Sequence, residues 1–266
     1  MKNILLSAAL CGLFLLAGCG KSVASDQKRG ILFSGDKKTL LKYNFALPDP
    51  EYVIPSGVTT IGRDAFNPGG KKSNLQTVII PKSVVAIEEN AFRNCNTLGS
   101  IDIPGSVKEI GRSAFEGCSI LTVVTLHKGL EEIRPDAFVG TPLKSIDIPS
   151  SVKLISGGAF ALTPIKSIDI PSSVKVIGKE AFAYCRQLST VTLHEGLEEI
   201  GYQAFEDTSI KSVTVPRSVK IIQPFAFYSC ESARVGKETK LVKCVYSARG
   251  FNGKTAFKDD CKIEYY

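Results

Sequence analysis

The feature that most constrains this chain is one unit of sequence written eight times. The unit reads apolar-Pro-x-x-Val-x-x-Ile-x-x-x-Ala-Phe, as in "IPSGVTTIGRDAF" from Ile54 and "IPGSVKEIGRSAF" from Ile103. The phenylalanines that end the copies recur every 22 to 26 residues, at Phe66, Phe92, Phe115, Phe138, Phe160, Phe182, Phe205 and Phe227. No single unit can bury its own apolar side, so the units must stack on one another.

A period in the twenties is typical of leucine-rich-repeat solenoids. We therefore predict a mainly β leucine-rich-repeat solenoid, a right-handed coil of eight repeats with parallel strands, over residues 54–235. A β-hairpin cap is expected at residues 31–53 and a C-terminal cap at residues 236–266. The small and large residues of each Ala-Phe pair should fill the interior.

Each repeat contains an alternating segment that predicts a strand. In "LGSIDIP", Ile101 and Ile103 point to one side while Ser100 and Asp102 point to the other, which is the pattern of a half-buried strand. Pro104 cannot donate to a strand ladder, so the strand should end there.

The eight copies of "IPxSVxxIGxxAFxxCxxLxxIxIP" resemble the BspA-like bacterial surface leucine-rich repeats. The segment Ile31–Gly62 also resembles the N-terminal hairpin of that family. The resemblance implies adhesion to host matrix proteins, host cell-surface proteins or other bacteria, without catalysis.

The N-terminus predicts export and lipid anchoring. Residues 1–18 hold one lysine, a short apolar run and small residues before Cys19, which is the pattern of a signal peptide. "LAGC", ending at Cys19, resembles the bacterial lipobox, in which the cysteine receives lipid and becomes the first residue; cleavage near Ala24 is the alternative. Residues 19–30 are then expected to be a polar tether. Gly20 after the cysteine favours the outer membrane.

The two histidines lie in a repeated octapeptide, "LHKGLEEI" with His127 and "LHEGLEEI" with His194. Both replace the proline that ends the strand in the other six repeats. At the spacing of neighbouring strands they are about 14 Å apart, whereas zinc ligands lie within ~2.1 Å of the metal. We therefore interpret them as strand-end substitutions in a duplicated three-repeat block, and predict neither a catalytic site nor a metal site.

The glutamates of the octapeptide have a similar explanation. Seven positions before the phenylalanine, Glu131 and Glu198 each stand between repeats that carry lysine, namely Lys108, Lys153, Lys175 and Lys220. Opposite charges on adjacent strands attract mildly, so ion pairs between coils are expected.

Six cysteines remain beyond the lipobox. Four occupy an inward position three residues after the phenylalanine and should be buried free thiols: Cys95, Cys118, Cys185 and Cys230. A Cys95–Cys118 bridge between consecutive coils is the alternative. Cys244 and Cys261 could form a disulfide that closes the C-terminal cap, worth ~3 kcal/mol.

Three repeats carry threonine in that inward position and are one residue shorter before the strand. They hold Thr141, Thr163 and Thr208. The hydroxyl is expected to hold a tighter backbone turn, whereas cysteine acts as a small apolar filler.

The outward strand positions predict the binding surface, on the concave face. We assign to it Ser100, Asp102, Thr125, Ser145, Asp147, Ser167, Asp169, Thr190, Thr192, Ser212 and Thr214. The neighbouring carboxylates of Asp147 and Asp169 repel each other and need relief, either from Lys144 and Lys166 or from a bound cation. The alternative is that the hydroxyl rows simply solvate a sheet face.

Composition narrows the function further. The formal net charge of +7 is spread thinly, which argues against a nucleic-acid partner. No phosphate loop, nucleophile elbow or paired-cysteine zinc motif is present, so neither an enzyme nor a cofactor is expected.

We therefore predict a lipid-anchored bacterial envelope protein, displayed on the outer membrane, that binds extracellular protein or glycan ligands. A periplasm-facing scaffold or assembly partner is the main alternative, and a hydrolase or metalloenzyme is the third.

Overall fold

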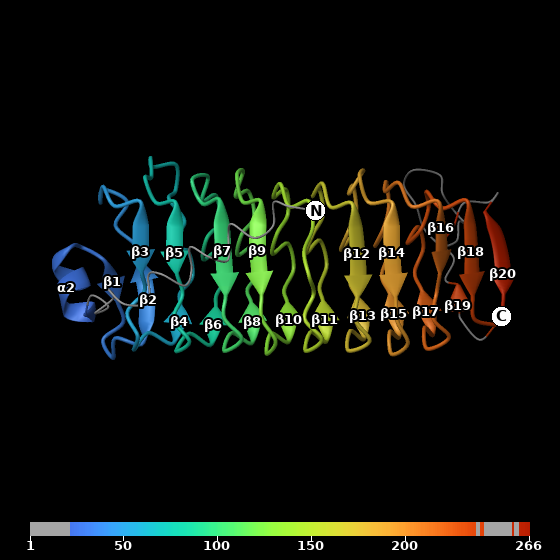
Figure 1. Ribbon diagram of the computed structural model, residues 1–266, viewed down its shortest axis with the longest axis horizontal. Helices are drawn as coiled ribbons and strands as arrows, with labels where there is room; N and C mark the ends of the chain where they lie inside the picture. Colours follow the sequence, from blue (N-terminus) through green and yellow to red (C-terminus); the bar gives the residue numbers. More distant parts are fainter. Residues whose placement is uncertain (1–21, 238–239, 242–256, 258–260) are drawn as a thin grey trace, which may run out of the picture.

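A computed structural model describes residues 22–237, 240–241, 257 and 261–266. The predicted signal peptide, Cys19 and Cys244 lie outside these residues. The chain winds into an elongated solenoid with helix α2 at one end and strand β20 at the other (Figure 1). This confirms the predicted leucine-rich-repeat solenoid with parallel strands. No helix within the described residues has the length and apolar character needed to cross a bilayer.

One side of the solenoid is a continuous sheet of eleven strands, most of only two residues, which we call the short-strand wall. In sheet order its strands are β1 (Leu32–Phe33), β2 (Thr39–Lys42), β4 (Thr60–Ile61), β6 (Ala86–Ile87), β8 (Glu109–Ile110), β10 (Glu132–Ile133), β11 (Leu154–Ile155), β13 (Val176–Ile177), β15 (Glu199–Ile200), β17 (Ile221–Ile222) and β19 (Lys240–Leu241). The strands β1 and β2 form the antiparallel hairpin that the sequence predicts, and the other pairs are parallel.

The other side, which we call the long-strand wall, is divided into separate sheets. Its strands are β3 (Glu51–Val53) with β5 (Thr77–Ile79), β7 (Ser100–Ile103) with β9 (Val123–Leu126), β12 (Ser167–Ile170) with β14 (Thr190–Leu193), and β16 (Ser212–Thr214) with β18 (Ser232–Val235) and β20 (Lys262–Tyr265). The fifth repeat contributes residues 145–148 at the equivalent place, and these form no strand.

The core between the two walls is a column of stacked aromatic rings. The eight repeat phenylalanines are 0–1% exposed, and neighbouring ring centroids lie 4.7 to 5.4 Å apart. Tyr43 extends the column at the N-terminal end and Phe257 at the C-terminal end. Stacked pairs add about 0.5–1.5 kcal/mol to the burial energy, so the column ties each coil to the next.

The turns around each phenylalanine need left-handed backbone. The residue two before it has a φ of 51 to 65° in every repeat, although only Gly158 among these positions is glycine. The three predicted threonines donate to the carbonyl of the phenylalanine three residues earlier, at 2.7 to 2.9 Å, which confirms their role in the turn. Cys95, Cys118 and Cys185 differ from simple fillers because each thiol donates to a phenylalanine carbonyl of the preceding coil.

The N-terminal segment differs from the sequence prediction. Residues 19–30 were expected to be a tether, but from Ser22 onward the chain forms helix α2 (Val23–Lys28) and packs against the solenoid. Ser22 caps the helix, because its hydroxyl accepts from the Ser25 amide. The tether prediction failed because the helix is held by residues far away in sequence.

The C-terminal segment extends both walls beyond residue 235. Strand β19 pairs with β17, β20 pairs with β18, and the Phe257 ring lies 5.6 Å from that of Phe227. The Ala256-Phe257 dipeptide is the sequence signal for this further coil.

Candidate functional site

The eleven residues predicted for the binding surface are all exposed. Strand pairing aligns nine of them in two columns along the long-strand wall, with Ser167 beside Thr190 and Asp169 beside Thr192. In the same way Asp102 lies beside Thr125. Successive residues of a strand face opposite sides, so Ile168, between Ser167 and Asp169, is buried in the core.

The columns are nevertheless interrupted. Ser100, Asp102 and Thr125 belong to the β7–β9 sheet, while Thr190 and Ser212 lie on strands of different sheets. Ser145 and Asp147 lie outside any strand. The wall is therefore a series of short platforms, and a ligand that spans it crosses the breaks between them.

Both histidines bind an aspartate of the preceding coil. The His127 Nε2 atom lies 2.7 Å from Asp102 Oδ1, and His194 Nε2 lies 2.7 Å from Asp169 Oδ1. The two imidazoles bind different aspartates in different coils, consistent with their predicted separation, and these partners were not predicted. The signal was present, because each histidine is 25 residues after an aspartate of an "IDIP" strand.

Of the two neighbouring carboxylates Asp147 and Asp169, the structure pairs Asp169 with His194 and neither with the predicted lysines. Among the ion pairs of the described residues, none joins Lys144 or Lys166 to Asp147 or Asp169. The coil after Asp147 carries Pro171 where a histidine would sit, so Asp147 lacks the partner that Asp169 has. In the part of the chain that the structure describes, no three His, Cys, Asp or Glu residues are grouped to hold a metal ion.

A groove of about 790 Å³ opens in the C-terminal third of the long-strand wall, over β14, β16, β18 and β20. It lies where β14 and β16 fail to join one sheet. Val191 and Leu193 on its floor are only partly buried, whereas Ile168 and Ile170, their counterparts on β12, are buried. Sites for small ligands have volumes of about 300–1,000 Å³, so the groove can hold one.

The chemistry of the groove is polar and mixed in charge. Hydroxyls of Thr192, Ser212 and Thr214 line it, and β18 and β20 add an Arg234–Glu264 ion pair of 3.4 Å. Hydroxyls both donate and accept hydrogen bonds, so this surface suits ligands rich in hydroxyl or amide groups.

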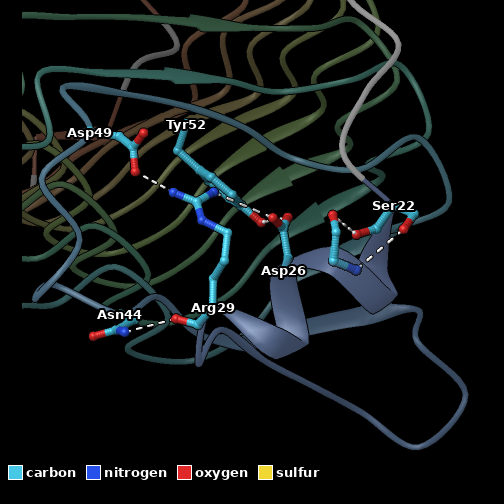
Figure 2. A network of polar contacts seen from close by, with 7 residues as sticks. Ser22, Asp26, Arg29, Asn44, Asp49 and Tyr52 are labelled. Carbon is cyan, nitrogen blue, oxygen red and sulfur yellow. Dashed lines mark hydrogen bonds and ion pairs between the residues drawn. The ribbon is translucent and has the colours of Figure 1, made fainter.

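A second polar cluster fastens α2 to the solenoid (Figure 2). The buried Asp26 carboxylate accepts a hydrogen bond of 2.7 Å from the Tyr52 hydroxyl, and Arg29 forms ion pairs with Asp26 and Asp49. Asn44 donates to the Arg29 carbonyl at 2.8 Å. Burial, together with the bond to Asp26, raises the pKa of Tyr52 well above its usual value. We call these five residues the N-terminal latch.

The short-strand side carries the predicted ladder of ion pairs. Glu131 lies between Lys108 and Lys153, at 3.8 and 2.6 Å, and Glu198 lies between Lys175 and Lys220, at 3.8 and 2.8 Å. The hydrogen bond from Lys153 lowers the pKa of Glu131. The prediction of ion pairs between coils is confirmed.

The four inward cysteines are buried and free, as predicted. Burial raises the pKa of the Cys185 thiol, which keeps it protonated and unreactive. Because Cys244 lies outside the described residues, the Cys244–Cys261 disulfide stays a prediction.

Comparison with known proteins identifies the repeat. The model of the BspA type leucine rich repeat region matches in six copies, over residues 43–164 and 153–237. No significant match was found among curated protein sequences.

Two solved structures share the fold. A leucine-rich repeat protein from Bacteroides ovatus is 24% identical with a TM-score of 0.53, over 86% of this chain and 62% of that one. A leucine-rich repeat protein from Eubacterium ventriosum is 22% identical with a TM-score of 0.51, over 84% of this chain and 52% of that one. This chain therefore spans about half to two thirds of the length of these relatives.

Proposed function

The chain belongs to the BspA-type leucine-rich repeat proteins, and from this we propose that it is a lipid-anchored protein of the bacterial cell surface that binds extracellular protein or glycan ligands through its long-strand wall. Cys19 carries the lipid, and the outer membrane is the site of display. The protein acts by contact alone, without catalytic residues or cofactor.

The observation that carries the proposal is the exposed polar surface of the long-strand wall, with the groove over β14 to β20. On the opposite wall, exposed charged side chains form ion pairs between neighbouring coils. The long-strand wall instead presents hydroxyls, which remain available to a partner. Without large aromatic anchors each contact is weak, so many anchored copies acting together would supply the avidity.

The main alternative is a periplasm-facing scaffold that uses the same wall for an envelope partner. Protease treatment of intact cells separates the two. Display at the surface predicts digestion of the protein while a periplasmic marker stays intact. Survival of the protein until the outer membrane is permeabilised would favour the scaffold.

A matched pair of variants tests the wall itself. Ser212→Lys places a long cation in the groove, and Val85→Lys places the same cation beside the short-strand wall, where four other repeats already carry lysine. We expect Ser212→Lys to reduce capture of matrix proteins and whole cells several-fold, and Val85→Lys to leave it unchanged. Equal capture by both variants would move the binding surface elsewhere.

A further inference from the structure

The N-terminal latch fixes the start of the described chain to one end of the solenoid. Helix α2 lies at the extreme N-terminal end, beside β1 (Figure 1), and its Asp26 side chain is 0% exposed. A carboxylate buried in this way is stable only with partners. Tyr52 and Arg29 supply them, so release of α2 would break a buried network rather than a surface contact.

Very little chain separates this docked helix from the proposed lipid. Only Gly20 and Lys21 lie between Cys19 and the helix cap Ser22. Fully extended, three residue steps span about 10 Å. The headgroup layer of one leaflet is itself roughly 5–8 Å thick, so Ser22 must lie at the membrane surface or within a few ångströms of it.

Exposed side chains of helix α2 and of the β1–β2 hairpin suit a lipid headgroup layer. Lys28 at the end of α2 is exposed, and so are Lys37 and Lys38 in the turn between β1 and β2. Leu32 and Leu41, on the same hairpin, are 57% and 45% exposed. Cations beside exposed apolar side chains are the combination that binds interfaces carrying anionic lipid.

We propose that the N-terminal end of the solenoid is a membrane-docking surface, and that the latch converts the lipid anchor from a flexible tether into a short, fixed mount. The proposal rests on lipid attachment at Cys19, which belongs to the proposed function. The partner is the anionic headgroup layer of the membrane that holds the lipid. The solenoid then stands end-on, with successive coils farther from the bilayer.

In this orientation the groove lies far from the membrane. Its first strand, β14, is about seven coils beyond the hairpin, which at ~4.8 Å per coil is roughly 35 Å. The groove therefore lies on the side of the stack toward its distal end, where a large partner can reach it without meeting the membrane.

Lysine footprinting of the lipidated chain in vesicles of phosphatidylethanolamine and phosphatidylglycerol tests the proposal. The reference is the Cys19→Ser chain mixed with the same vesicles. We expect several-fold slower modification of Lys28, Lys37 and Lys38 in the lipidated chain. Lys144, on the side of the stack, and Lys262, at its far end, serve as internal controls and should react at the reference rate.

Two results would overturn the proposal. Protection of Lys144 together with the end lysines would mean that the solenoid lies flat, and unchanged reactivity of all of them would mean that the tether is free. The mass of the N-terminal peptide reports separately whether Cys19 carries lipid, so a failure of the anchor is distinguished from a failure of docking.

Opening the latch supplies the second arm. Arg29→Ala with Asp26→Ala removes the buried carboxylate and the partly buried guanidinium that pairs with it, and leaves the core aromatic Tyr52 in place. The freed residues 19–30 could then span up to about 40 Å, so protection of Lys37 and Lys38 should be lost. Ser22→Ala weakens only the exposed helix cap, so this variant should lose only part of the protection of Lys37 and Lys38. Full protection in the open-latch variant would show that the latch does not set the orientation.

Discussion

The two walls of the solenoid are made by the same repeats, yet one is a single sheet and the other is broken. In the short-strand wall each coil contributes two residues to an unbroken ladder, as Ile133, Ile155 and Ile177 do in consecutive coils. In the long-strand wall β14 and β16 lie in different sheets, and residues 145–148 join none.

Loop length explains part of this difference. The segment from the strand-ending proline or histidine to the phenylalanine has the same length in all eight repeats, so the short strands always meet in register. The segment before the long strand is one residue shorter in threonine repeats than in cysteine repeats. Two of the breaks, before residue 145 and before β16, fall where a threonine repeat follows a cysteine repeat.

The two walls of each repeat therefore have different roles. The short-strand wall and the phenylalanine column hold the stack together, while the long-strand wall tolerates breaks and opens a groove at one of them.

Removal of one ring from the column should damage both walls. Phe160→Ala leaves a cavity at a fully buried site between the Phe138 and Phe182 rings. We expect a loss of about 3–5 kcal/mol in the free energy of unfolding, measured by chemical denaturation. Ile120→Ala, at a 48% exposed side chain, is the control and should change it little. Similar losses in the two variants would refute the idea that the column carries the stability.

A matched pair of isoleucines in one coil compares the walls directly. Ile155, on β11, is paired on both sides and is 0% exposed, whereas Ile146 is also buried, at 6% exposed, but lies outside any strand. Cavity costs for Ile→Ala are about 2–5 kcal/mol and are lower where the surroundings can collapse. We expect the loss in free energy of unfolding to be near the upper end of this range for Ile155→Ala and near the lower end for Ile146→Ala. The reverse order in thermal or chemical unfolding would contradict the comparison.

Lengthening one threonine repeat should join β14 and β16 in one sheet. Thr208→Cys with one serine inserted after Ser209 gives the repeat the cysteine-type length. We expect β14 and β16 to pair, and at ~1 kcal/mol per hydrogen bond their newly bonded amides should exchange about fivefold more slowly. Thr208→Cys without the insertion is the control, and slowing in that variant as well would show that loop length is not the cause.

The smallest effect should come from the charges beside the short-strand wall. The pKa of Glu131 is lowered in the folded protein, so its contribution is present above the ordinary pKa of 4.5 and is lost as the pH falls through the lowered value. Glu131→Gln should therefore lower the thermal midpoint slightly at neutral pH, and the difference from the native chain should vanish at strongly acidic pH. Glu51→Gln is the control, because Glu51 forms no ion pair with the other described residues. A difference that persists at acidic pH would point to a cause other than charge.

Sequence reasoning predicted the parts of the structure that recur. The buried Ala-Phe pairs, the free thiols, the threonine turns and the Glu131 ion pairs each follow from a position seen several times. Repetition made those predictions secure, because a role that fits one repeat must fit its neighbours in the stack.

The features that the sequence analysis missed occur once or depend on a partner in another coil. The latch joins Asp26 to Tyr52 across 26 residues, and Asp102 meets His127 across 25. Helix α2 is too short to be stable by propensity alone, so nothing local in its sequence identified it.

The coil, its period and the side chains that fill its interior follow from the repeated residues alone, because stacking similar units leaves one way to bury the apolar face of each. The pairing of the long strands, the place of the groove and the attachment of the N-terminal helix became visible in the folded chain. Those outcomes depend on one-residue differences in loop length and on single contacts between distant residues, which a repeating pattern does not encode.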